Sequence, residues 1–142
     1  MVNQNPEFVK ELLLNQIDAV QTDILAAFQT NRLQASFQNH LQTGTRYNGN
    51  GKVEAYLAFS PDDLLGSNSL DLTLRLDCTP RGAMLTTEIA WSDGRVIDGV
   101  FVCNFCPDCL EHLSEQVDQV LDEKRGQMVG RMVDILGNFQ PA

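Results

Sequence analysis

The first regular pattern of apolar positions covers residues 5–29 and is typical of an amphipathic helix. Asn5, Pro6 and Glu7 suit its start, because they supply a capping side chain, a proline at the first helical position and an acid in the first turn. The apolar positions are Phe8, Leu12, Leu13, Ile17, Val20, Ile24, Leu25 and Phe28. A shorter second helix is expected over residues 33–41, where apolar residues lie four apart, and a loop over residues 45–51.

The period of the pattern then changes to that of strands. Alternating apolar and polar residues predict strands over residues 52–59, 70–78, 83–91 and 95–103. Helical spacing returns at residue 107, Gly126 suggests an interruption, and the spacing then continues to Gly137. We therefore expect one α+β domain over residues 1–142, in which a four-stranded antiparallel meander is flanked by a long N-terminal helix, the short second helix and a long C-terminal helix.

The last two predicted strands are joined by Asp93-Gly94, a strong hairpin signal. A two-residue turn there would place Trp91 opposite Val96 and Leu85 opposite Val102, on the face toward the core. The opposite face would carry Met84, Ala90, Ile97, Phe101 and Cys103. An antiparallel sheet with one solvated face does not carry apolar residues on both sides. The second face is therefore expected to pack on a further helix or on a second copy of the chain.

The charge balance narrows the classes of partner. The chain of 142 residues has a net charge of −9, which opposes binding to nucleic acid or to an anionic membrane and favours a positively charged partner. No apolar run approaches the length of a membrane span, and the first residues do not have the pattern of a secretory signal. A cytoplasmic location is therefore expected.

The four cysteines are the strongest candidates in the sequence for a metal-binding or redox site. Cys103, Cys106, Cys109 and His112 follow one another at intervals of three, and Cys78 lies earlier, at the end of a predicted strand. Tetrahedral zinc takes four thiolate or imidazole ligands and often uses a Cys-x-x-Cys pair. In a meander, Cys78 and Cys103 would end strands that run in the same direction. A zinc site formed by Cys78, Cys103, Cys106 and Cys109, or with His112 in place of one cysteine, is therefore expected.

Other interpretations of the same cysteines stay open. The Cys-x-x-Cys-x-x-Cys spacing is similar to the start of a bacterial ferredoxin run, which indicates an iron–sulfur cluster. Cys106-Pro107 at a helix start is a setting in which a thiol pKa falls, as dithiol redox chemistry requires. The cysteines also suit simple burial, in which case no cofactor is bound.

These observations favour a small acidic binding or adaptor protein that works through protein–protein contacts, with itself as one expected partner in a homodimer. An iron–sulfur or dithiol redox protein is the alternative. No hydrolase, phosphate-binding or metalloprotease motif is present in the sequence, so no catalytic residue is assigned, and a non-catalytic role is favoured.

Overall fold

The computed structural model describes residues 9–27, 41–47, 52–60, 69–79, 81–91, 94–105 and 112–137. Two helices and five strands are formed by these residues. They are, in chain order, α1 (Lys10–Ala27), β1 (Leu41–Tyr47), β2 (Lys52–Phe59), β3 (Leu70–Thr79), β4 (Gly82–Trp91), β5 (Val96–Phe105) and α3 (Leu113–Gly137). Every neighbouring pair of strands is antiparallel, and the strand order β1-β2-β3-β4-β5 follows the chain. The predicted α+β fold with an antiparallel sheet between an N-terminal and a C-terminal helix is confirmed.

The prediction of four strands was wrong, because residues 41–47 form the additional strand β1 at one edge of the sheet. Leu41 pairs with Phe59, and Tyr47 pairs with Val53. The alternation in β1 is weak: threonines take two of the core-facing positions, and Gly44 interrupts the other face. Pairing with the strongly apolar β2, rather than the propensity of β1 itself, explains the strand. The rest of the expected second helix, residues 33–40, lies outside the described residues.

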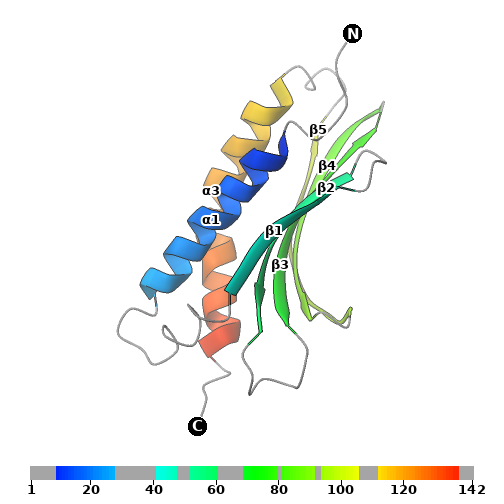
Figure 1. Cartoon of the computed structure of the whole chain (residues 1–142). Coiled ribbons are helices and arrows are strands. Elements are labelled where there is room, and N and C mark those ends of the chain that lie inside the picture. The colour runs from blue at the N-terminus through cyan, green and yellow to red at the C-terminus, as the bar shows by residue number, and fades with distance from the viewer. Residues whose placement is uncertain are drawn as a thin grey trace.

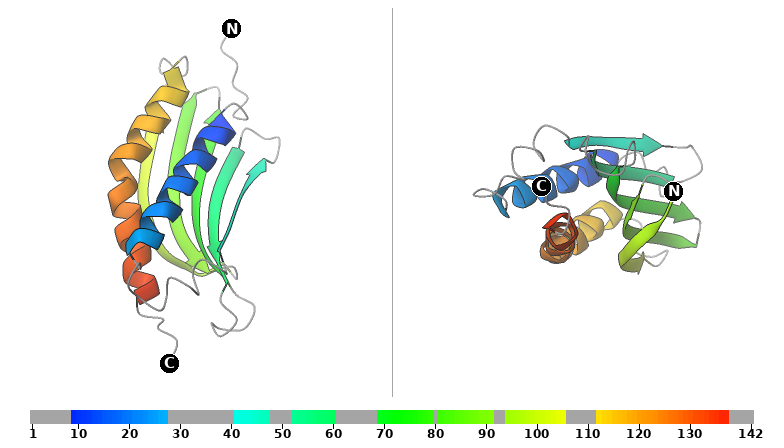
Figure 2. Two further views of the ribbon diagram at one scale, coloured as in Figure 1. Left: turned by 60° about the vertical axis from the view of Figure 1, so that its left-hand side comes forward. Right: turned by 90° about the horizontal axis from the view of Figure 1, so that it is seen from below.

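Both described helices cover the same face of the sheet (Figures 1 and 2). The core lies between them and the strands, and its strand residues occupy alternate positions, as the pleat requires. The fully buried apolar strand residues are Val53, Ala55, Leu57, Leu70, Leu72, Leu74, Leu76, Leu85 and Ile89. The leucine alternation that predicted β3 thus faces the helices, and its polar partners face the other way.

The two helices contact each other through a polar group as well as apolar side chains. Gln16 of α1 is almost fully buried, and its Nε2 donates hydrogen bonds to Asp118 at 2.8 Å and Asp122 at 2.9 Å. Arg125 donates from one guanidinium nitrogen to Gln16 Oε1 at 3.1 Å. Because three α3 residues converge on one glutamine, this network fixes the register of α3 against α1.

The C-terminal helix is continuous through Gly126 and Gly130, so the interruption suggested by Gly126 does not occur. A Cβ atom at either glycine would meet no neighbouring heavy atom within 4 Å, which means that neither marks a close helix contact. Of the predicted first turn of this helix, residues 107–111 lie outside the described residues.

Candidate binding face and the cysteine positions

The two described cysteines lie on the helix-covered side of the sheet, two strands apart. Cys78 of β3 pairs with Ala83 of β4, and Leu85 of β4 pairs with Cys103 of β5. Two strand spacings amount to about 10 Å. Two thiolates bound to one zinc are held within about 4 Å of each other, because each Zn–S bond is only about 2.3 Å long. The register therefore favours the set in which His112 replaces Cys78.

Cys78 is half-buried, and burial raises the pKa of its thiol; the negative charge of Asp77 raises this pKa further. A thiol in this state is largely protonated near neutral pH, which makes it a poor nucleophile. Cys103 is also half-buried and, like Cys78, forms no disulfide.

The remaining residues of the predicted metal site are only partly described. Cys106 and Cys109 lie outside the described residues. His112 is exposed at the start of α3, where its Nδ1 lies 3.9 Å from a carboxylate oxygen of Glu115. Within the described ranges, no three His, Cys, Asp or Glu side chains come together as a metal site. The cysteine site thus stays a prediction.

The second face of the sheet, here called the open face, is covered by no described helix or strand (Figure 2). Cross-strand pairing arranges its residues in rows that run from β1 to β5. One row contains Arg46, Glu54, Arg75, Thr86 and Val102. The row therefore changes from charged on β1–β3 to apolar on β5.

The β1–β3 half of the open face is held by ion pairs around a single carboxylate. Glu54 accepts a 2.8 Å hydrogen bond from Arg75 Nε, and Arg46 Nη1 lies 3.9 Å from its other oxygen. The bond to Glu54 raises the pKa of Arg75. Arg46 also stacks on Tyr56, with 4.2 Å between its guanidinium carbon and the ring centroid. Two guanidinium groups thus share one carboxylate, which leaves a local excess of positive charge.

The β4–β5 half of the open face carries exposed apolar side chains beside the polar Thr86, Glu88 and Asn104. Val96 and Val102 keep 59% and 61% of their surface exposed, and Met84 keeps 39%. Ile97, also 39% exposed, lies unpaired at a register shift of β5. Side chains of this kind, gathered on one half of a sheet, are typical of a surface that contacts another molecule.

The predicted register of this hairpin was wrong. Trp91 pairs with Arg95 through a 2.9 Å bond from its N–H, and Gly94 donates back to Trp91 O, also at 2.9 Å, so the turn begins one residue earlier than a two-residue turn would. Gly94 has a φ of 98°, a conformation that glycine adopts without strain. Together with two register shifts in β4–β5, this places Cys103, not Val102, opposite the buried Leu85. Val102 pairs with Thr86 on the open face.

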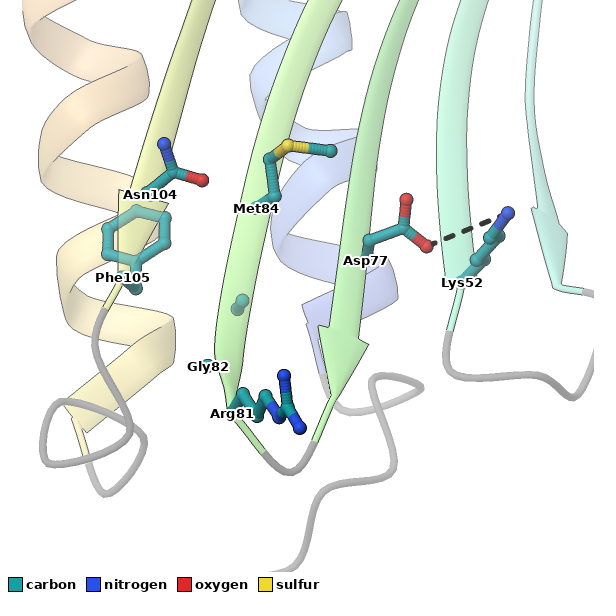
Figure 3. Close-up of a pocket in the computed structure, with 8 residues that line it drawn as sticks. Lys52, Asp77, Arg81, Gly82, Met84, Asn104 and Phe105 are labelled. Carbon is teal, nitrogen blue, oxygen red and sulfur yellow. Dashed lines mark ion pairs between the residues drawn. The ribbon is translucent and has the colours of Figure 1, made fainter.

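A shallow hollow of about 470 Å³ lies at the end of the open face near the β3–β4 turn (Figure 3). Met84 and Phe105 provide apolar surface there, and Lys52 and Arg81 provide positive charge. Lys52 Nζ lies 4.0 Å from Asp77 Oδ1 and is half-exposed, so this ion pair leaves ammonium donors open to solvent. The hollow is a feature of the open face that the sequence pattern did not indicate, since its residues come from β2, β3, β4 and β5.

The long edge strand β5 is less open to pairing than its length suggests. Gln127 of α3 donates a 3.2 Å hydrogen bond to the carbonyl oxygen of Val100. Two β-bulges also interrupt the regular ladder between β4 and β5, and bulges and covering side chains are devices that protect sheet edges. The open face, rather than the β5 edge, is therefore the better contact surface.

None of the described helices is both long and apolar enough to cross a membrane. Comparison with known proteins gives no match: no family model fits the chain, and no curated protein or solved structure is significantly similar to it.

Proposed function

We propose that this chain is a non-catalytic binding protein that works through protein–protein contacts on the open face, and that one of its partners is a second copy of itself. The observation that carries the proposal is the group of exposed apolar side chains on the β4–β5 half of this face, Met84, Val96 and Val102. Covering a surface of this kind is favourable by about 25 cal/mol per Å² of apolar area removed from water.

Light scattering of the purified chain tests this proposal. A homodimer would give a mass near twice 15.8 kDa at micromolar concentration. Val102→Glu should weaken the dimer at least tenfold, because a carboxylate would be buried in an apolar contact without a partner. Gln119→Glu adds the same charge on the exposed side of α3 and should leave the dimer unchanged. A wild-type monomer across the micromolar range would contradict the homodimer.

A structural zinc ion held by Cys103, Cys106, Cys109 and His112, or by Cys78 in place of His112, is part of the same proposal. Such a site would fix the end of β5 to the start of α3, which follow each other in the chain. The alternative is a dithiol redox or iron–sulfur role for these cysteines, and the raised thiol pKa of Cys78 disfavours a reactive thiol at that position alone. The two interpretations differ in metal content and colour, since an iron–sulfur protein is brown.

A further inference from the structure

The charges of the open face are separated along the strands. The cationic end contains Arg46, Lys52, Arg75 and Arg81 against only Glu54 and Asp77. The acidic end contains Glu88, in the same cross-strand row as Tyr56 and Thr73, and Asp71, in the next row toward that end. The described side chains of the open face thus give its cationic end a net charge of +2 and its acidic end −2; Arg95, which lies over the Trp91 ring, is not counted.

These eight charged residues balance, although the chain as a whole carries −9. The nine excess negative charges therefore belong to residues outside this set. Two copies that meet through their open faces would bring together surfaces without net charge, which avoids the repulsion expected between two strongly acidic molecules.

We infer that the open face binds the open face of a second copy about a two-fold axis that runs across the strands. This inference rests on the proposed homodimer and specifies its geometry. Such an axis places the cationic end of each copy over the acidic end of the other. It also places β4–β5 of one copy over β4–β5 of its partner, so the two apolar halves cover each other.

The opposite orientation is disfavoured by the same observations. A two-fold axis along the strands would place the cationic end over the cationic end, and β5 over β1. The apolar Val102 would then face the charged half, where Arg46 lies half-exposed. Like charges placed against each other at an interface oppose association.

The size of the face is adequate for a stable dimer. Five strands of seven to ten residues, spaced about 4.8 Å apart, span up to roughly 700 Å². A standard interface takes about 800 Å² from each partner. The strands curve with their middle toward the helices, so the sheet is concave on the open side (Figure 1).

Apolar groups along β4–β5 also suit this arrangement. Met84 lies at the cationic end, Val96 at the acidic end and Val102 between them. Reversing the strand direction places Met84 near the partner's Val96, and Val102 near the partner's Gly99, the neighbouring open-face position on β5. A Cβ atom at Gly99 would meet nothing within 4 Å, so the chain itself leaves room for a side chain there.

A pair of charge-reversal variants tests the inference. Lys52→Glu/Arg81→Glu changes the cationic end from +2 to −2, and Asp71→Lys/Glu88→Lys changes the acidic end from −2 to +2. Each variant alone then presents ends of like charge to its own copy. In an equimolar mixture, every end of one variant meets an end of opposite charge on the other.

We expect each variant to dissociate at least tenfold more readily than the wild type at low salt, and the mixture to recover the dimer, as measured by light scattering. Circular dichroism checks that each variant is folded; if one is not, the single changes Lys52→Glu and Glu88→Lys replace the double ones. Variants that dimerise alone as tightly as the wild type, or a mixture of folded monomers that does not recover, would overturn this geometry while leaving the homodimer intact. A wild-type monomer would overturn both.

Discussion

At the scale of single residues, Gly44 and Tyr56 form a cross-strand pair on the open face in which the ring occupies the space that a side chain on Gly44 would need. A Cβ atom at Gly44 would lie 2.5 Å from Tyr56 Oη and 2.8 Å from Cζ. The two residues pair directly across β1 and β2. The aromatic ring thus covers the backbone of a glycine that would otherwise weaken an edge strand.

Whether a substitution at Gly44 raises or lowers the free energy of unfolding should depend on Tyr56. Gly44→Ala should destabilise the wild type by about 1 kcal/mol, because the new methyl group forces the ring away and disturbs its stacking on Arg46. In a Tyr56→Ala background the same change should stabilise the fold by about 0.5–1 kcal/mol, because alanine suits a strand better than glycine. Urea unfolding of the four proteins measures both values. The same sign in both backgrounds would contradict the pairing.

At the scale of elements, the contact between α1 and α3 depends on a buried amide. Gln16 is 4% exposed, and its two amide hydrogens are donated to Asp118 and Asp122. Both carboxylates belong to α3, so this single amide joins the two helices.

Gln16→Ala should lower the free energy of unfolding by about 1–3 kcal/mol, since it leaves two carboxylates and one guanidinium without their shared partner. Gln16→Glu should be at least as harmful, because it places a third carboxylate beside the other two. Chemical denaturation gives the values, and Gln119→Ala on the exposed side of α3 is the matched control. Equal effects at both glutamines would show that the network is not needed.

The sequence predicted the elements that carry a strong apolar period and missed those formed by pairing. The leucine alternation of β3 and the helical stripe of α1 are such periods, and each faces the core in the structure. The strand β1 has no such period, because Thr43, Gly44 and Thr45 form its centre, and it exists through its pairing with β2.

The sequence predicted that the β4–β5 hairpin has an apolar second face, but not which residues lie on it. An apolar second face was expected for the β4–β5 hairpin from its residues alone, and Met84 and Ile97 are indeed exposed. The predicted faces of Cys103 and Val102 were exchanged. A shift of one residue moves every side chain of a strand to the other face, and the positions of the β-turn and of the two bulges set this shift. The charged half was not predicted, since Arg46, Glu54 and Arg75 come from three strands.

At the scale of the whole molecule, the layer of helices and the sheet are connected by the segment between β5 and α3. This segment contains Cys106 and Cys109, and it is preceded by Cys103 and followed by His112. A zinc ion there would tie the two layers at one point. A structural zinc site contributes directly to the free energy of folding, because its ligands are not assembled in the unfolded chain.

The proposed zinc site predicts a particular pattern of thiol reactivity. Elemental analysis of freshly purified protein should give about one zinc per chain, and removal of the metal by a chelator should lower the melting temperature. In the native protein only Cys78 should be alkylated, and slowly, because burial raises its thiol pKa. After chelation, mass spectrometry of the peptides should show Cys103, Cys106 and Cys109 modified as well.

If Cys78 is protected together with the other three cysteines, the site is formed by four cysteines. His112 would then not be a ligand, although Cys78 and Cys103 lie two strands apart. Absence of metal, with all four thiols equally reactive before and after chelation, would leave the two layers joined by packing and the Gln16 network alone.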